Sequence, residues 1–327
     1  MKKSIKLLSL IFTAILLIAA FSSCNGFPPL DDELEINVSV LNGTTGFGAA
    51  KLISDAQNGN TTLNYNFSIE SDASLITAGL INGSIDIAAL PTNAAAAVYN
   101  KTQGEVKIAA VNTLGVLYLV TNGEKITVNS ISDLEGKTVY CPAQNPAFIF
   151  EAICRANGVN VTIDTAYAQP ADLRTALASG LLDIAVLPEP MVTIAKSAND
   201  KLVTALDLTE EWEKAYGENT LMQGCIVVRT EWAKNHPNEL NEFLKAYKES
   251  VEYTVAHPAD ASELIVSTAV FAGKAPVAAK AIPNCNIVYI DGDEMASSLS
   301  IFFEKLYAIS PSAVGGSIPD SGIYLKK

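Results

Sequence analysis

The sequence predicts an α/β protein made of two similar lobes, and three observations lead to this class. The chain has 327 residues, enough for two ordinary domains, and 49% of them are apolar, which rules out global disorder. A twelve-residue segment, LINGSIDIAALP at 80–91, returns as LASGLLDIAVLP at 177–188 with seven identities and an offset of 97. Strand and helix patterns alternate around both copies. We therefore expect two α/β lobes with right-handed crossovers.

Each copy of the repeat describes the same local structure. A helix ends at Gly83 or Gly180, because glycine suits the left-handed position that closes a helix. A short apolar strand follows, and its unbroken apolarity is typical of a parallel strand buried on both faces. Pro91 or Pro188 then ends the strand. Ligands of such open sheets bind beyond the carboxyl ends of the strands, so we expect a cleft between the lobes.

The other elements follow from apolar periodicity and from turn residues. The first lobe is predicted to contain strands at 35–41, 64–69 and 106–111, and helices at 47–57 and 73–81. A strand at 114–120 carries the chain into the second lobe, with strands at 137–141, 161–166 and 203–206 and helices at 131–136, 147–156, 173–179 and around Trp212. A strand at 223–229 returns the chain, before helices at 238–256, 259–269, 276–281 and 293–309 and a strand at 287–290. The predicted lobes are 35–112 plus 226–327, and 113–225.

The N-terminus has the form of a secretory signal. Lys2, Lys3 and Lys6 precede an uncharged apolar run over 7–21, which at 15 residues is shorter than the roughly 20 residues of a membrane span. The run ends in FSSC at 21–24, which resembles a bacterial lipobox apart from the phenylalanine. The resemblance implies a signal peptide at 1–23, palmitate and other lipid on Cys24, and a tether at 24–34. The alternative is an ordinary secreted protein with a free Cys24.

Composition and motifs exclude several functions. The chain carries 35 acidic and 22 basic side chains, a net charge of −13, whereas nucleic-acid-binding proteins present a basic face. His236 and His257 both precede proline, so we expect them in turns between helices rather than in a catalytic site. The spacings of Cys141, Cys154, Cys225 and Cys285 fit no zinc site. We interpret these cysteines as buried free thiols, with a Cys225–Cys285 disulfide as the alternative, and expect no metal, no cofactor and no enzymatic activity.

Five segments, taken in order, resemble the substrate-binding proteins of ABC importers, specifically the nitrate, sulfonate, taurine and thiamine-precursor type. They are GTTGFGAAKL at 43–52, SIDIAALPTNAAA at 84–96, SISDLEGKTVY at 130–140, LLDIAVLPEPMVT at 181–193 and VVRTEW at 227–232. The resemblance implies a periplasmic-binding-protein-like type II fold, in which two Rossmann-like lobes are joined by two crossing strands. It also implies a monomeric lipoprotein on the extracytoplasmic face of the cell membrane that delivers a small organic solute to an ABC permease and its ATPase. The alternative is a ligand-sensing module for a signalling partner, without transport.

The candidate ligand-binding residues all follow a predicted strand: Thr44, Thr45, Gly46, Thr92, Asn93, Gln144, Asn145 and Glu189. Free N–H groups at the start of a helix point to this edge, and glycine allows a ligand to approach the backbone. The alternative for Thr45 and Thr92 is a capping role at the helix N-terminus. Amide side chains such as Gln144 and Asn145 can both donate and accept hydrogen bonds.

Glu189 lies between two prolines, and its carboxylate offers only acceptors. No arginine falls in a strand-end loop, so we expect the carboxylate to lack a protein partner and to receive a donor or a positive group from the ligand. The alternative is that Glu189 points away and accepts from a backbone N–H or water. The predicted cleft therefore favours a neutral or cationic organic solute, such as a heteroaromatic amine.

Lipid attachment at Cys24 is testable by cell fractionation. Replacing Cys24 by Ala removes the thiol that would carry the lipid. Because acyl chains would supply the membrane anchor, we expect the variant to leave the membrane fraction. The wild-type protein is the control. Retention of the variant in the membrane fraction would contradict the anchor.

Overall fold

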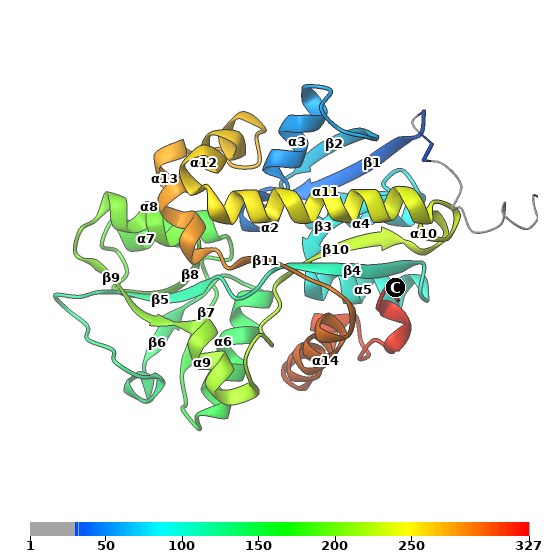
Figure 1. The fold of residues 1–327 in the computed structure, drawn as a ribbon. Coiled ribbons are helices and arrows are strands. Elements are labelled where there is room, and N and C mark those ends of the chain that lie inside the picture. Colours follow the sequence, from blue (N-terminus) through cyan, green and yellow to red (C-terminus); the bar gives the residue numbers. More distant parts are fainter. Residues whose placement is uncertain (1–29, 32, 327) are drawn as a thin grey trace, which may run out of the picture.

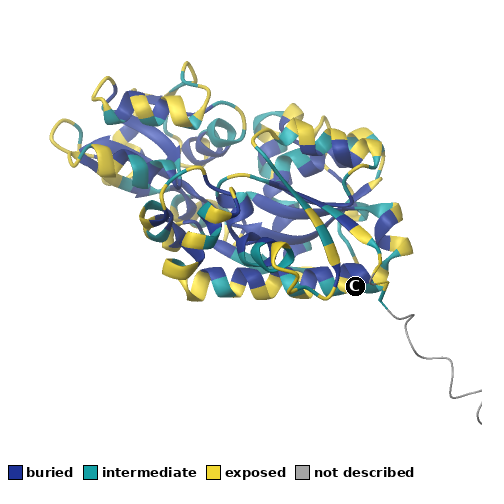
Figure 2. Cartoon of the chain, turned by 90° about the horizontal axis from the view of Figure 1, so that it is seen from above, coloured by how far each residue is buried: buried dark blue, intermediate teal, exposed yellow. Residues whose placement is uncertain are grey.

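The computed structural model describes residues 30–31 and 33–326. The predicted signal segment and Cys24 lie outside the described residues. Over the described part, the chain forms two α/β lobes, each with its own sheet (Figure 1). No helix in this part is both long enough and apolar enough to cross a bilayer. Buried strands run through the centre of each lobe, while exposed positions lie on the outer helices (Figure 2).

Lobe one contains a six-stranded sheet in the order β11-β4-β10-β3-β1-β2. The strands are β1 (Glu35–Leu41), β2 (Asn64–Glu70), β3 (Ile87–Pro91), β4 (Val106–Thr113), β10 (Gly224–Arg229) and β11 (Ile287–Ile290). β1 pairs in parallel with both β2 and β3, whereas β10 is antiparallel to its neighbours β3 and β4. The predicted strands 35–41, 64–69, 106–111, 223–229 and 287–290 are thus present in one sheet.

Lobe two contains a five-stranded sheet in the order β7-β6-β8-β5-β9. Its strands are β5 (Leu117–Asn122), β6 (Thr138–Tyr140), β7 (Thr162–Asp164), β8 (Ile184–Pro188) and β9 (Leu202–Asp207). β6 is parallel to β7 and β8, and β5 runs antiparallel between β8 and β9. The repeat predicted β3 and β8 as equivalent strands, and each lies beside the antiparallel strand of its own sheet.

The helices fill the connections between strands. In lobe one they are α2 (Thr44–Phe47), α3 (Ala50–Gln57), α4 (Ala73–Asn82) and α5 (Thr92–Thr102). In lobe two they are η1 (Ile131–Leu134), α6 (Asn145–Ala156), α7 (Pro170–Ala178), α8 (Met191–Ala198) and α9 (Leu208–Tyr216). The chain after β10 forms α10 (Thr230–Asn235), α11 (Pro237–Ala256), α12 (Pro258–Ser267), α13 (Ala275–Ala281), η2 (Ile282–Asn284), α14 (Gly292–Ile309), η3 (Pro311–Val314) and η4 (Ser321–Ile323).

Two local predictions were wrong. The helix expected at 47–57 is divided into α2 and α3. Between them, Gly48 packs against α11, where a Cβ on it would lie 2.8 Å from Val251 Cγ2. The strand expected at 114–120 begins only at Leu117. Residues 114–116 are the crossing itself, where the Leu114 N–H donates to the Asn286 carbonyl and the Val116 N–H donates to Gln223 Oε1.

The cysteines and histidines occupy the predicted kinds of position. Cys141, Cys154, Cys225 and Cys285 are all buried and free, so the alternative disulfide is not formed. Burial raises the pKa of the Cys225 and Cys154 thiols to about 12, which keeps both protonated and unreactive near neutral pH. His236 separates α10 from α11, and His257 separates α11 from α12.

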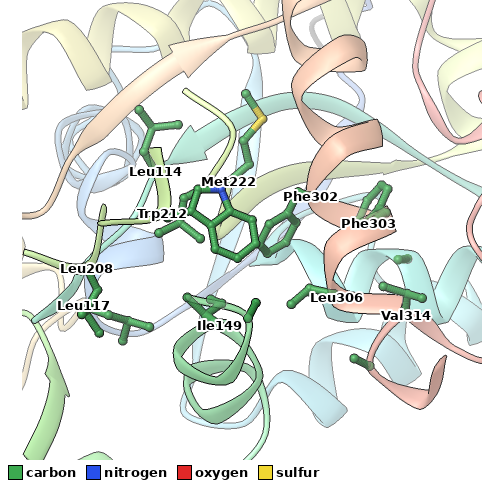
Figure 3. Packing of buried hydrophobic residues seen from close by; sticks show 14 of the residues in the cluster. Leu114, Leu117, Ile149, Leu208, Trp212, Met222, Phe302, Phe303, Leu306 and Val314 are labelled. Atoms are coloured by element: carbon green, nitrogen blue, oxygen red, sulfur yellow. The ribbon is translucent and has the colours of Figure 1, made fainter. Parts of the chain in front are cut away.

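An apolar cluster joins the lobes where the chain crosses between them. Trp212 of α9 is fully buried, and its ring lies 5.8 Å from the ring of Phe302 on α14. The same cluster contains Leu114 and Met222 from the two crossings and Ile149 from α6 (Figure 3). We call this group the hinge cluster. Because it contains side chains from both lobes and both crossings, it connects α6 and α9 to α14 beside the crossings.

We expect Phe302→Ala to lower the free energy of unfolding by about 3–5 kcal/mol, because it leaves a cavity in the hinge cluster. Urea unfolding measures this change. As a control, Leu75→Ala on α4 removes a side chain that is 57% exposed and should cost less than about 0.5 kcal/mol. Equal effects of the two substitutions would contradict the packing described here.

Candidate functional site

The carboxyl ends of the parallel strands in the two sheets meet at the boundary between the lobes. Thr44, the first residue of α2 after β1, donates its hydroxyl to the carbonyl oxygen of Glu189, which follows β8, at 2.8 Å. Both residues are buried. The structure therefore brings together two predicted site residues that are 145 positions apart in sequence and belong to different lobes.

The loop after β1 is supported by Val270 and by Asn112 on β4, which are distant in sequence. Gly43 has φ 84°, a left-handed conformation that favours glycine, and its N–H donates to the Val270 carbonyl. Asn112 on β4 donates from Nδ2 to the Thr45 carbonyl, at 2.9 Å, and to the Tyr247 hydroxyl, also at 2.9 Å. Gly43 is the N-cap of α2 and no side chain caps this helix, so the capping alternative for Thr45 is wrong.

Thr92 and Asn93 form the first turn of α5, directly after β3. The Thr92 N–H donates to the Gln223 carbonyl, which attaches this turn to the returning crossing. Pro91 is the N-cap and no side chain caps α5, so the capping alternative for Thr92 is also wrong. The Thr92 hydroxyl is fully buried and has no hydrogen bond of normal length and angle, although the Cys225 thiol lies beside it.

Gln144 and Asn145 occupy the corresponding place in lobe two, at the start of α6. Gln144 is the exposed N-cap residue and has φ 65°, which is uncommon for a residue with a side chain. Asn145 is half-buried, and its Oδ1 has no hydrogen-bond partner. Pro146 follows and has no N–H, and no side chain caps α6. Among the described residues, no hydrogen bond connects Gln144 or Asn145 to lobe one.

Unpartnered oxygens gather at these strand ends. Six buried side-chain polar atoms of the described residues lack a hydrogen-bond partner, and three of them are Thr92 Oγ1, Asn93 Oδ1 and Asn145 Oδ1. A fourth, Thr209 Oγ1, lies in the first turn of α9 after β9. A buried polar group without a partner costs roughly 1–3 kcal/mol. Oxygens in the first turns of α5 and α6 therefore have hydrogen-bonding capacity that the described residues do not use.

The Glu189 carboxylate has partners in its own lobe. Its two oxygens accept from the Thr193 N–H at 3.1 Å and from the Thr193 hydroxyl at 2.9 Å, in the first turn of α8. The expectation that this carboxylate would be left without a protein partner is wrong, and the structure has the alternative arrangement, in which it accepts from a backbone N–H. Burial raises the pKa of Glu189, and the bonds from Thr193 only partly oppose that effect.

A second cross-lobe hydrogen bond lies near the first. The Tyr118 hydroxyl on β5 donates to the Asn284 carbonyl in η2 at 2.8 Å. We call the Thr44–Glu189 and Tyr118–Asn284 bonds the latch. Tyr118 and Glu189 also line a pocket of about 520 Å³ together with Lys196 and Lys280. A second pocket, of about 500 Å³, lies on the other side of α8, against Gly43 and Pro190.

Some residues around the site carried no sequence signal. Asn112 and Gln223 hold the strand-end turns and the crossings in place, but Asn112 directly follows the predicted strand 106–111 and Gln223 begins the predicted strand 223–229, and no motif marks either residue. Arg174 reaches the boundary between the lobes from α7, whereas the sequence analysis considered only arginines in strand-end loops. The described residues contain no group of histidine, cysteine or acidic side chains arranged to hold a metal ion.

The family comparison matches a large part of the chain. Residues 68–261 match the family model described as NMT1/THI5 like. A search of curated proteins finds no match. Solved structures do match, and they include an ABC transporter protein from Parabacteroides distasonis, with 24% identity and a TM-score of 0.76 over 91% of this chain and 100% of that chain.

Two more solved structures share the fold. The periplasmic aliphatic sulphonate binding protein SsuA of Escherichia coli has 14% identity and a TM-score of 0.71, over 90% of this chain and 92% of that chain. The ligand binding component of an ABC-type import system from Staphylococcus aureus, crystallised with zinc, has 12% identity and a TM-score of 0.65, over 89% and 96% of the two chains. These likenesses establish the two-lobed α/β fold of this protein.

We expect the hydroxyls of Thr44 and Tyr118 to hold the lobes together. A neutral hydrogen bond contributes about 0.5–1.5 kcal/mol, so Thr44→Val or Tyr118→Phe should each lower the closed-to-open ratio roughly two- to tenfold. Small-angle scattering of the cargo-free protein should then give a larger radius of gyration. Tyr216→Phe is the matched control, since Tyr216 donates to Ala152 within lobe two. An unchanged radius of gyration in both latch variants would contradict the role of these two bonds in holding the lobes together.

Proposed function

The chain belongs to the NMT1/THI5-like family, and from this membership we propose that it is an extracytoplasmic solute-binding protein of an ABC importer. In this proposal a small organic solute binds between the lobes and is delivered to a permease and its ATPase. The solved proteins of the same fold support this role, because their names describe ABC transporter and ligand-binding components. Two of these names describe binding proteins, and we propose a binding role without catalysis here as well.

One observation carries the proposal for the site: unpartnered oxygens from both lobes lie at the carboxyl ends of the strands. Thr92 and Asn93 supply them from lobe one, and Asn145 supplies one from lobe two. We propose that the solute contacts these three residues together with Thr45, Gly46 and Gln144. Thr44 and Glu189 border the site and connect the lobes across it. A solute held by both lobes would favour the closed arrangement, because it interacts with both only when they are together.

The position of the protein in the cell follows from the proposed role. A receptor for an importer works outside the cytoplasmic membrane, so the signal-like N-terminus and lipidation of Cys24 fit the same proposal. Within the tether predicted at 24–34, Leu30 and Leu34 pack against lobe one and the Asp31 N–H donates to Glu239, so only the residues before Leu30 would connect the folded lobes to the membrane surface.

Transport is tested in cells that carry or lack the gene. Native mass spectrometry of the purified protein should identify a retained solute, and uptake of that labelled solute should fall in the deletion strain and return with the wild-type gene. Normal uptake in the deletion strain, with the solute bound to the purified protein, would instead favour a sensing role.

The unpartnered oxygens predict which variants lose the solute. Each charge-neutral hydrogen bond is worth about 1 kcal/mol, so Asn93→Ala with Asn145→Ala should weaken solute binding by roughly tenfold or more. Native mass spectrometry or calorimetry with the identified solute measures the change. Asn58→Ala is the control, because Asn58 lies at the end of α3 and its amide donates to Ser54 within the same helix. Equal solute binding by the double variant and the control would remove these amides from the site.

A further inference from the structure

The outer strand of the lobe-one sheet, β2, lacks the features that usually keep an edge strand from pairing. Edge strands are commonly protected by shortness, by a bulge, by lysine or by proline. The edge strands β7 and β11 have only three and four residues, and the ladders of β9 and β11 contain register shifts. β2 has seven residues, pairs with β1 in unbroken register and contains no lysine or proline (Figure 1). Of the four sheet edges, β2 is therefore the one best suited to receive a further strand.

The outward backbone groups of β2 belong to Tyr65, Phe67 and Ile69. The Glu70 carbonyl accepts from the Asn42 N–H at 2.8 Å, so the backbone groups of Glu70 point to the β1 side. These groups point to opposite sides in successive residues of a strand, so Tyr65, Phe67 and Ile69 direct theirs away from β1. Among the described residues, no hydrogen bond outside the β1–β2 ladder uses them. This edge therefore presents a row of donors and acceptors that can serve as a template for another strand.

The sequence of β2, NYNFSIE, is complementary to itself. When a second copy is placed antiparallel about Phe67, this residue faces its own counterpart and Tyr65 faces Ile69. Each of these facing pairs can exchange two N–H···O bonds, about six in total, because their backbone groups point outward. An aromatic side chain opposite a β-branched one is also a favourable cross-strand pair. The strand thus matches a second copy of itself in both backbone and side chains.

The same three residues carry apolar side chains that are incompletely covered. The Tyr65 ring lies 5.7 Å from the Phe67 ring and 5.8 Å from the ring of Phe243, and Ile69 packs against the same core. Tyr65, Phe67 and Ile69 are nevertheless only half-buried, so a neighbouring strand would remove further apolar surface from water. A two-fold axis at Phe67, perpendicular to the sheet, keeps these side chains of both copies on one face.

The charges are compatible with this register. Asn64 faces Glu70, the only charged residue of β2, so no like charges oppose each other within the pairing. Each chain has a net charge of −13, which opposes association. At physiological ionic strength, however, exposed charges separated by more than about 8 Å are largely screened. The overall charge therefore weakens the contact without excluding it.

We propose that two copies of this chain associate through β2, paired antiparallel about Phe67, so that their lobe-one sheets form one continuous sheet. The contact is transient, because a single pair of strands buries less surface than a stable dimer requires. This inference departs from the monomer that the sequence resemblance implies. It rests on residues outside the proposed solute site and does not depend on transport.

Analytical ultracentrifugation of the purified protein at physiological ionic strength tests the contact. We expect a monomer–dimer equilibrium between about 10 μM and 1 mM. Asn64→Glu places like charges at both ends of the pairing and should raise the dissociation constant by about threefold or more, whereas Asn64→Lys should lower it by a similar factor. Both variants lose the same asparagine, so a structural effect of that loss cannot produce opposite shifts. The controls are Asn129→Glu and Asn129→Lys, which make the same charge changes at an exposed position in lobe two.

Hydrogen exchange provides the second readout. The N–H groups of Tyr65, Phe67 and Ile69 should become protected as the protein concentration rises, and Asn64→Glu should reduce that protection. Three results would overturn the proposal: a wild-type monomer up to about 1 mM, equal shifts from the Asn64 and Asn129 substitutions, or protection of these N–H groups that is independent of concentration. The last result would mean that another part of the same chain covers the edge. Loss of the importer role in cells leaves these measurements unchanged, so the two proposals can fail separately.

Discussion

The two crossings of the chain between the lobes constrain the rest of this structure. After β4 the chain leaves lobe one and forms β5 between β8 and β9 of the other sheet, and after α9 it returns as β10 between β3 and β4 of the first. Gln223 connects the two crossings, because its N–H donates to Thr113 and its side chain accepts from Val116. Lobe one cannot complete its sheet without the returning chain, because β10 lies between β3 and β4, and the chain passes between the two sheets only in the short segments 114–116 and 217–223.

The contacts on the two sides of the crossings contribute different amounts of free energy. On the side of α14, the hinge cluster buries large side chains such as Trp212 and Phe302, and each contributes about 1.5–3 kcal/mol. On the side of α8, the latch consists of two neutral hydrogen bonds, each worth about 0.5–1.5 kcal/mol. We expect the weaker side to open first when the lobes separate. In the proposed function, this opening would expose the strand-end turns of α5 and α6 to the solute.

The sequence predicted more of the fold than of the site. The repeat and the apolar runs identify β3 and β8, and the order of elements along the chain follows from helix and strand periodicity. The break between α2 and α3 was not predicted, because Gly48 and Ala49 between them keep helical backbone angles. The sequence placed Glu189 at a strand end, but it did not reveal that Thr193 in the next helical turn satisfies its carboxylate, or that Arg174 reaches the lobe boundary from a helix.

The repeat also explains why the two halves of the cleft differ. At the offset of 97, Thr92 corresponds to Glu189, and both follow the proline that ends a buried strand. In lobe two the side chain at this position bonds to its own helix, and its carbonyl oxygen accepts from lobe one. In lobe one the backbone N–H is held by Gln223, and the hydroxyl is left without a hydrogen bond. Equivalent positions thus differ in their bonds: the Glu189 carbonyl accepts a hydrogen bond from the other lobe, whereas the Thr92 hydroxyl, which we propose contacts the solute, has no partner among the described residues.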